Sequence, residues 1–306
     1  MKLGIVIVTY NSQTDIARLL ESLIIQNNEN LAIYIVDNNS TDQTLEIVQT
    51  YQTALSICII SCKTNNGFAK GNNIGIQKAM DDGCELLFIL NPDIQLEQKC
   101  IEILTERIKT DEKIGVIGPV VLYGNKPGNI IQGYGVKANF RTQKKYDPLG
   151  NEKLLNEIPA ENYVDFVLGG AMMIRSKVLK ITGLFEEDYF MYNDELDIAY
   201  RINTAGFSTL CMRDAIVRHF HDFSTKNKKG NNLMYYYMMR NKYLYFRKFQ
   251  LYPNLVISLI DDFIKLPLTI NWAIRRMGNI KLLKFYYSGL FDGLAGKKGE
   301  SGKSFD

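Results

Sequence analysis

An unbroken apolar run meets a short polar cluster in Leu86-Leu87-Phe88-Ile89-Leu90-Asn91-Pro92-Asp93. The five apolar residues predict a strand that is buried on both faces, and Pro92 ends its pairing because proline has no amide hydrogen. Asp93 therefore follows the carboxyl end of a strand, which is where open α/β sheets bind their ligands. We expect this carboxylate to hold a metal or a polar group of a substrate. The alternative is a turn that only caps the next helix.

The composition is that of a globular protein. The chain has 306 residues, of which 46% are hydrophobic and 23% charged, enough for one large or two modest domains. Its five cysteines lack the spacing of metal ligands, which favours a reduced, cytoplasmic setting. The sequence enters a strand directly after Met1, so we expect no export signal.

The positive charge is concentrated in the last part of the chain. From Lys226 onward there are fifteen Lys and Arg against five Asp and Glu, whereas the preceding part has 21 basic and 28 acidic residues. The basic part is also rich in tyrosine and phenylalanine. This combination suits an anionic membrane surface and also nucleic acid.

Strand and helix patterns alternate in the first half. Buried strands are predicted at 3–9, 32–36, 55–61, 86–90 and 115–123, with helices that include 16–24 and 94–108. Such alternation predicts a parallel sheet with right-handed crossovers. The polar clusters that end three of these strands, at residues 9–11, 37–39 and 91–93, would then face one crevice at the same edge.

A glycine-rich segment follows the third strand. In Asn65–Gly75 the glycines recur every four residues and so share one helical face, while the asparagines and Lys70 offer donors to a phosphate or to hydroxyls. It lacks the Gly-Lys-Ser/Thr of a Walker loop. A role in helix packing alone is the alternative.

The second half is less regular. Residues 124–162 show no periodicity and predict a long excursion or flap, and residues 164–174 predict a strand kinked at Gly169 and Gly170. Asp194, Glu195 and Asp197 crowd the first turn of the next predicted helix. Acids there complement the helix dipole, or supply a general base.

The only two histidines, His219 and His221, end an apolar segment and are either inert or close enough to reach a metal. Residues 226 onward are predicted to be helical. Residues 251–274 are strongly apolar, but Asp261, Asp262 and Lys265 argue against a membrane-spanning helix. Residues 251–274 fit a helix in the membrane interface and a helix in the protein core equally well. Residues 296–306 predict a frayed polar tail.

Seven short motifs follow one another along the chain. They are Val8-Thr9-Tyr10-Asn11, Val36-Asp37-Asn38-Asn39-Ser40, Asn66–Gly75, Leu90-Asn91-Pro92-Asp93, Gly169–Ile174, Phe190–Asp197 and His219 with Ser224. Their order is that found in family 2 glycosyltransferases, and over about residues 3–250 the chain resembles the bacterial rhamnosyltransferase-like branch of that family.

The resemblance implies an α/β protein of the GT-A fold in residues 1–225, with a basic, aromatic helical extension in 226–306. It implies an inverting transferase that uses a nucleotide-diphosphate sugar and Mg²⁺ or Mn²⁺. Asp93 and His219 would bind the metal, since an asparagine replaces the first acid of the family's Asp-x-Asp signature. The implied donor-binding residues are Thr9, Tyr10, Asn11, Asp37, Asn66, Gly67, Lys70, Asn73 and Asn91.

The base is implied by the family's Glu-Asp-x-Asp motif, for which this chain has Asp194-Glu195-Leu196-Asp197. Position favours Glu195 and residue type favours Asp194. Gly169, Gly170 and Asp197 are expected to bind the acceptor. We expect rhamnose from dTDP-rhamnose, a lipid-linked saccharide acceptor, and a peripheral location on the cytoplasmic face of the membrane, without nucleic acid.

Other functions remain open at this point. A galactosyl- or glucosyltransferase of the same family is the nearest alternative. A nucleotidyltransferase would share the sheet and the metal, but the Gly-x-Gly-Thr-Arg opening is missing. A non-catalytic nucleotide-sugar or nucleic-acid binding protein is supported only by the basic extension, and nucleic-acid binding predicts a steep loss of affinity with salt.

Overall fold

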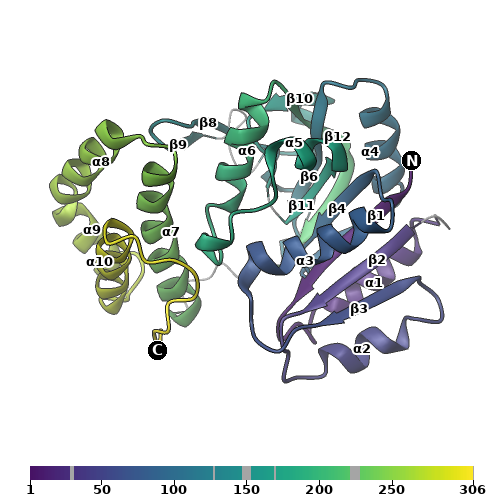
Figure 1. The fold of residues 1–306 in the computed structure, drawn as a ribbon, viewed down its shortest axis with the longest axis horizontal. Coiled ribbons are helices and arrows are strands. Elements are labelled where there is room, and N and C mark those ends of the chain that lie inside the picture. Colours follow the sequence, from purple (N-terminus) through teal and green to yellow (C-terminus); the bar gives the residue numbers. More distant parts are fainter. Residues whose placement is uncertain (28–30, 127, 147–152, 169, 221–227, 306) are drawn as a thin grey trace. The chain divides into compact units, whose positions relative to one another are not determined.

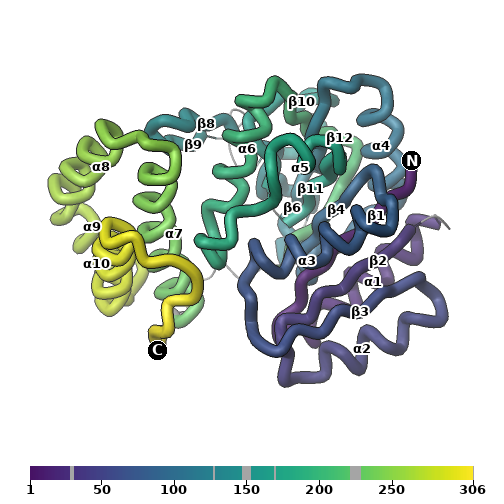
Figure 2. The backbone as a smooth tube through the Cα atoms, viewed as in Figure 1, coloured from purple at the N-terminus to yellow at the C-terminus, as the bar shows by residue number. Residues whose placement is uncertain are grey.

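The computed structural model describes residues 1–27, 31–126, 128–146, 153–168, 170–220 and 228–305 (Figures 1 and 2). Contacts divide the chain into two compact units. The first unit comprises Met1–Ala138, Lys145–Phe185 and Ile198–His221. The second comprises Asn139–Lys144, Glu186–Asp197 and Asp222–Asp306.

A mixed sheet forms the centre of the first unit, in the order β10-β12-β6-β11-β4-β1-β2-β3. The strands β1, β2, β3 and β4 are parallel to one another, whereas β11 runs antiparallel between β4 and β6. β5 pairs with β12, and β7 pairs with β6. The bounds are β1 Leu3–Thr9, β2 Leu31–Asp37, β3 Ile57–Ser61, β4 Leu86–Leu90, β5 Ile94–Leu96, β6 Ile114–Tyr123, β7 Ile131–Gly133, β10 Glu161–Val164, β11 Ala171–Arg175 and β12 Ser208–His219. A separate ribbon pairs β8 Lys137–Asn139 with β9 Lys144–Tyr146.

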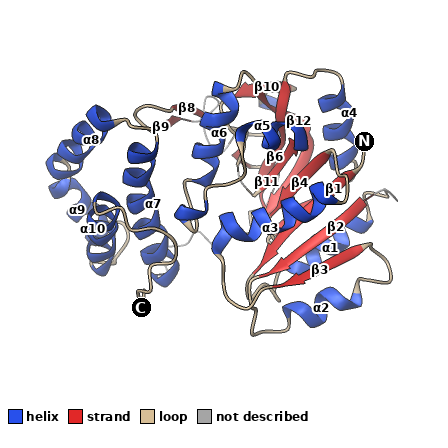
Figure 3. Ribbon diagram, in the orientation of Figure 1, coloured by secondary structure: helices blue, strands red, loops and turns tan. Residues whose placement is uncertain are grey.

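Helices cover both faces of this sheet (Figure 3). Helices α1 Ile16–Ile24, α2 Thr44–Thr50 and α4 Cys100–Lys109 share one apolar core with Ile5 and Ile7. On the opposite face, α3 Gly67–Asp81, α5 Ser176–Thr182 and the end of α6 Asp194–Thr204 share a core with Val6. Because alternate residues of β1 point to opposite faces, one apolar strand contributes to both cores.

The glycines of α3 allow this helix to lie close to β1. A Cβ atom at Gly75 would be 2.6 Å from Val6 Cγ1, and one at Gly71 would be 2.8 Å from Val8 Cγ1. The four-residue spacing of these glycines therefore serves helix–sheet packing. This packing does not exclude ligand contacts elsewhere in the segment.

Three predicted boundaries were wrong. Residues 94–108 are not one helix, because Ile94–Leu96 form β5 and α4 begins only at Cys100. Asn91-Pro92-Asp93 consequently does not cap a helix. The excursion at 124–162 contains β7, β8, β9 and the start of β10. Residues 164–174 are not one strand, because β10 ends at Val164 and β11 begins at Ala171.

The second unit is mainly helical, with α7 Lys228–Lys248, α8 Tyr252–Ile264, α9 Leu266–Arg275 and α10 Lys281–Leu294. Phe190, Tyr236, Tyr237 and Phe285 form its aromatic core together with Phe305. The prediction of a frayed tail was thus wrong, since Phe305 is buried near the end of the chain. Within the described part of the chain, no helix combines the length and the apolar character that crossing a bilayer requires.

Candidate active site

The polar ends of three neighbouring strands lie at one edge of the sheet, as predicted. Thr9 at the end of β1 is in register with Asp37 at the end of β2, and Ile7 of β1 is in register with Leu90 of β4. Asn91 therefore follows β4 at the same edge. This edge is where a parallel sheet leaves room for a ligand.

Asp37 is buried and holds two loops together. Its Oδ1 accepts hydrogen bonds from Thr9 Oγ1 at 2.9 Å and from Ser40 Oγ at 2.6 Å, and its Oδ2 accepts one from the Ser40 backbone N–H at 2.9 Å. The carboxylate thus fixes the loop after β2 against the end of β1. In this arrangement Asp37 shapes the edge through its protein partners.

The loop after β1 is tied to the same region. Asn11 has a positive φ of 50°, and its Oδ1 accepts from the Thr41 N–H at 2.8 Å. The Asn38 side-chain amide donates to the Gly67 carbonyl at 2.9 Å, which links the start of α3 to the end of β2. The Tyr10 side chain is exposed. The loop after β1 is therefore tied to the loop after β2, and the end of β2 is tied to the start of α3.

The other glycine-rich residues have different surroundings. Asn66 is the cap of α3 and is partly exposed, and Lys70 is exposed on its first turn. Asn73 is buried and exchanges two hydrogen bonds of 2.9 Å with the backbone of Phe185. Asn73 thus joins α3 to the loop after α5, whereas Asn66 and Lys70 are accessible to a ligand.

Asp93 and His219 are brought together from distant parts of the sequence. His219 Nε2 is 3.3 Å from Asp93 Oδ2, with side-chain exposures of 15% and 18%. On the other side of the ring, Nδ1 is 3.0 Å from Gln132 Oε1. The Phe220 N–H also donates to the Asp93 carbonyl at 2.9 Å, which fastens the end of β12 to this loop.

Asn91 contacts Gly170 through its backbone. Its N–H donates to the Gly170 carbonyl at 2.9 Å, and a Cβ atom at Gly170 would lie 3.5 Å from the Asn91 side-chain amide nitrogen. Gly170 is thus beside the Asn91 side chain. Gly169, His221 and Ser224 lie outside the described residues.

The acidic triplet begins α6, as predicted, and its members differ in burial. Asp194 is 1% exposed, Asp197 is fully buried and Glu195 is partly exposed. Burial, followed by the charge of Glu195, raises the pKa of the Asp194 carboxyl well above its usual range. In the described part of the chain, Asp194 Oδ1 has no hydrogen-bond partner. These surroundings favour the protonated form of Asp194.

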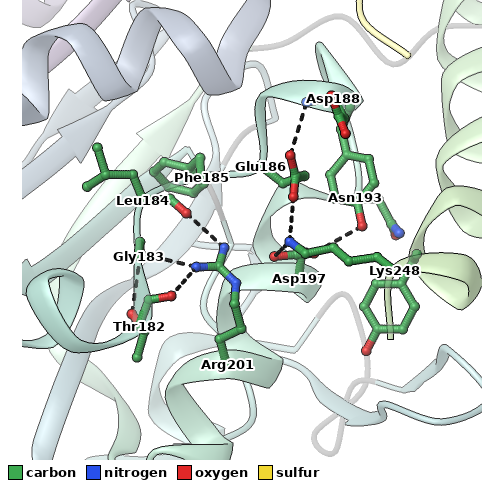
Figure 4. A network of polar contacts seen from close by, with 12 residues as sticks. Thr182, Gly183, Leu184, Phe185, Glu186, Asp188, Asn193, Asp197, Arg201 and Lys248 are labelled. Carbon is green, nitrogen blue, oxygen red and sulfur yellow. Dashed lines mark hydrogen bonds and ion pairs between the residues drawn. The ribbon is translucent and has the colours of Figure 1, made fainter. Parts of the chain in front are cut away.

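Asp197 is the centre of a polar network in the second unit (Figure 4). Lys248 Nζ lies 2.9 and 2.7 Å from its two oxygens and 2.7 Å from Glu186 Oε2. The Tyr189 hydroxyl donates to Asp197 Oδ2 at 3.0 Å. Asp197, expected to bind the acceptor, is thus engaged by Lys248 and Tyr189.

A second network in Figure 4 belongs to the first unit. Arg201 Nη1 donates to the Thr182 and Gly183 carbonyls at 2.6 and 3.1 Å, and Nη2 donates to the Leu184 carbonyl at 2.9 Å. Gly183 has a φ of 80°, a conformation that suits glycine. The guanidinium therefore fixes the loop that ends α5.

Sequence reasoning missed three residues that these contacts identify. Ser40 stands in a quoted motif, but its bonds to Asp37 were not expected. Gln132 lies in the segment without periodicity and gives no local signal. Lys248 is one of many lysines in the basic extension, so its pairing with Asp197 follows only from tertiary structure.

The first unit is thus a mixed α/β sheet with acids, amides and an imidazole at its strand ends. The model of glycosyl transferase family 2 matches residues 4–182, and the chain belongs to that family. It is a glycosyltransferase with a helical C-terminal part.

Several curated proteins are similar along most of the chain. The low-salt glycan biosynthesis hexosyltransferase Agl10 of Haloferax volcanii is 25% identical over 98% of this chain and 92% of its own length. The N-acetylglucosaminyl-diphospho-decaprenol L-rhamnosyltransferase of Mycobacterium tuberculosis is 25% identical over 76% of this chain and 80% of its own. The dTDP-rhamnosyl transferase RfbF of Shigella flexneri is 23% identical over 96% of both chains.

A solved structure confirms the fold. The mannosyltransferase PcManGT from Pyrobaculum calidifontis, in complex with GDP-Man and Mn²⁺, superposes with a TM-score of 0.59 at 14% identity. The match covers 97% of this chain and 88% of that one. The prediction of a GT-A fold within family 2 is thereby confirmed.

Proposed function

We propose that this glycosyltransferase moves a hexose, with rhamnose favoured, from a nucleotide-diphosphate donor to a hydroxyl of a lipid-linked saccharide. The observation that supports this most is the Asp93–His219 pair beside strand ends that carry Asp37 and Asn91. The names of the relatives from Mycobacterium tuberculosis and Shigella flexneri include L-rhamnosyltransferase and dTDP-rhamnosyl transferase. They favour dTDP-rhamnose over a galactosyl or glucosyl donor.

The Asp93–His219 pair fits a divalent cation. Asp93 Oδ2 and His219 Nε2 are 3.3 Å apart, so both could hold one ion, and a carboxylate and an imidazole are both metal ligands. Among the described residues there is no group of three His, Cys, Asp or Glu that could hold an ion. Two protein ligands are sufficient where phosphate oxygens and water complete the coordination, as is common for Mg²⁺.

The bound cation would neutralise negative charge on the leaving diphosphate. Asp93 and His219 would hold it, with Gln132 orienting the imidazole through Nδ1. Asn66 and Lys70 are accessible donors for the phosphates or hydroxyls of the donor sugar. The loops that carry Asn11, Asn38 and Gly67 would border the nucleotide.

Glu195 is the proposed general base. It is partly exposed, whereas burial raises the pKa of its neighbour Asp194 and favours the protonated form there. An ionised carboxylate can take the proton of the acceptor hydroxyl as that oxygen attacks the anomeric carbon, which speeds transfer by about 10²- to 10⁴-fold. Attack from the side opposite the leaving diphosphate inverts the anomeric configuration.

A donor screen tests this proposal. The purified chain is incubated with dTDP-rhamnose, UDP-glucose, UDP-galactose and GDP-mannose, each with Mg²⁺, with Mn²⁺ or with a chelator. We expect dTDP-rhamnose to raise the Tm by mass action and to be hydrolysed slowly only when metal is present. If none of the nucleotide sugars raises the Tm or releases its nucleotide, the proposed function is refuted.

A lipid surface is the proposed partner of helices α8 and α9. Large apolar side chains are exposed on these helices, by 49 to 71%: Val256, Ile257, Ile260, Phe263, Ile264, Leu268 and Ile274. From Lys265 to Lys284 the sequence has five basic residues and no acidic one. Apolar and basic side chains together match the interface of an anionic bilayer.

Vesicle binding tests this surface. We expect the chain to sediment with phosphatidylglycerol vesicles and not with phosphatidylcholine vesicles, and Ile264→Gln with Leu268→Gln to abolish sedimentation. Ile181→Gln is the control, because Ile181 is equally exposed on α5, at 65%. A dimer in solution that the α8–α9 variant dissociates would identify the surface as an interface between copies, and would overturn the lipid assignment.

A further inference from the structure

The loop that precedes the acidic triplet has an unusual backbone. Phe190, Tyr192 and Asn193 have positive φ angles of 64°, 64° and 70°. Positive φ is uncommon for residues other than glycine, and rare for bulky side chains. Such conformations persist only where the surroundings hold them. Asn193 directly precedes Asp194 and Glu195, so whatever holds this loop also sets the start of α6.

Asn241 of α7 holds three carbonyls of this loop. Its side-chain amide nitrogen donates to the Tyr189, Met191 and Tyr192 carbonyls at 3.0, 2.7 and 2.9 Å. Asn241 is fully buried, so water does not compete for these bonds. The amide therefore ties together the backbone on the two sides of Phe190.

Arg240, the preceding residue, adds to the same attachment. Its Nη2 donates to the Tyr189 and Asp188 carbonyls at 2.8 and 3.3 Å, and its Nε donates to Asn241 Oδ1 at 3.0 Å. Its Nη1 donates to the Gly299 carbonyl at 2.6 Å. Burial lowers the pKa of this guanidinium. A buried guanidinium needs hydrogen-bond acceptors in place of water. For Arg240 the loop provides two of them, the Asp188 and Tyr189 carbonyls.

Aromatic stacking fixes the side chain of the loop. The rings of Phe190 and Tyr237 are stacked, with centroids 5.3 Å apart and an interplanar angle of 24°. The Arg240 guanidinium carbon lies 4.6 Å from the centroid of the Tyr237 ring. Side chain and backbone of the loop are thus both held by one turn of α7.

We propose that Arg240 and Asn241 are positioning residues that fix the loop 188–193 and thereby the carboxylate of Glu195. The proposal rests on the proposed function for the role of Glu195 as base. All of the contacts lie within the second unit, which also contains Glu195. The donor-side residues Asp37 and Asp93 belong to the first unit. Loosening the loop should therefore impair proton removal from the acceptor, and leave donor binding unchanged.

The test compares two buried asparagines of the same helix. Asn241→Leu removes the loop contacts, whereas Asn232→Leu is the matched control. Asn232 is buried in α7, where its amide donates to the Phe305 carbonyl at 3.1 Å and its Oδ1 accepts from Asn279 at 2.8 Å. Arg240→Lys is a second, milder variant, since it keeps the charge and loses the forked donors.

For Asn241→Leu we expect kcat to fall by about 10- to 100-fold, because a small displacement of a reacting group has effects of that size. The KM for the donor should stay unchanged, and Arg240→Lys should show the same pattern to a lesser degree. Asn232→Leu should leave kcat unchanged even where it lowers the Tm equally. Equal kcat values for the Asn241 and Asn232 variants would overturn the proposal.

Hydrogen exchange supplies a readout that does not depend on activity. Amides of residues 188–195 should exchange faster in Asn241→Leu than in the wild type, and should be unaffected in Asn232→Leu. Unchanged exchange in Asn241→Leu overturns the attachment of the loop. If the wild type transfers no sugar from any donor, the proposed function fails, and hydrogen exchange alone still decides whether these residues hold the loop.

Discussion

Replacing Lys248 by methionine should destabilise the second unit strongly. The ammonium group is paired with Asp197, which is fully buried, and with Glu186. Methionine keeps the apolar stem and removes the charge, while the Tyr189 hydroxyl still donates to Asp197 Oδ2. Burial and the charge of Asp197 raise the pKa of Tyr189, which keeps that hydroxyl protonated.

The size of this destabilisation follows from the burial of the ion pair between Lys248 and Asp197. Removing one partner of a buried ion pair destabilises a protein by about 3 to 5 kcal/mol. The Lys248 side chain is 29% exposed, so water reaches part of it, and the lower end of the range applies. Glu186 is 25% exposed, and its share is at most about 1 kcal/mol. We expect the free energy of unfolding to fall by about 3 kcal/mol.

Urea unfolding measured by tryptophan fluorescence is the assay, because Trp272, the single tryptophan, lies in α9 of the same unit. A double-mutant cycle with Asp197→Asn isolates the interaction energy between Lys248 and Asp197. Lys265→Met is the control, since Lys265 pairs with Asp261 on an exposed helix surface. Equal small losses for Lys248→Met and Lys265→Met would refute the claim that the buried pair of Lys248 and Asp197 stabilises the second unit.

Two further predictions concern single residues. Because folding raises the pKa of Asp194, its contribution to stability is fully present below the unfolded value of about 3.9 and is lost as the pH rises through the folded pKa. The Tm of the wild type should therefore fall relative to that of Asp194→Asn as the pH is raised above about 4, and parallel Tm curves would contradict this. Gly75→Ala should destabilise the chain by about 1 to 3 kcal/mol in urea unfolding, because its Cβ would overpack against Val6. If the free energy of unfolding instead rose by about 1 kcal/mol, the difference in helix propensity between alanine and glycine, Val6 would have moved to make room for the added methyl group.

The central strands and the edge of the sheet could be predicted from sequence because the signals are local. Continuous apolar runs such as Leu86–Leu90 have few alternatives to a buried strand, and Pro92 marks the end of one. Parallel pairing then brings Thr9, Asp37 and Asn91 to one edge without further information. The crowding of acids at the start of α6 was equally local.

Other features depend on pairings across the chain. Ile94-Gln95-Leu96 fits a helix or a strand, and its pairing with β12 decides for the strand. The polar tail gives no sign that Phe305 is buried in an aromatic core. His219 and Gln132 are 87 positions apart, so no spacing rule could connect them.

Sugar transfer by the variants Glu195→Gln and Asp93→Asn is the decisive measurement for the proposed roles of these two carboxylates. With dTDP-rhamnose, metal and a lipid-linked acceptor, we expect Glu195→Gln to lower kcat by about 10²- to 10⁴-fold while the Kd for the donor stays unchanged. We expect Asp93→Asn to weaken metal-dependent donor binding as well. Turnover at the wild-type rate in both variants would contradict the assignment of these carboxylates to sugar transfer.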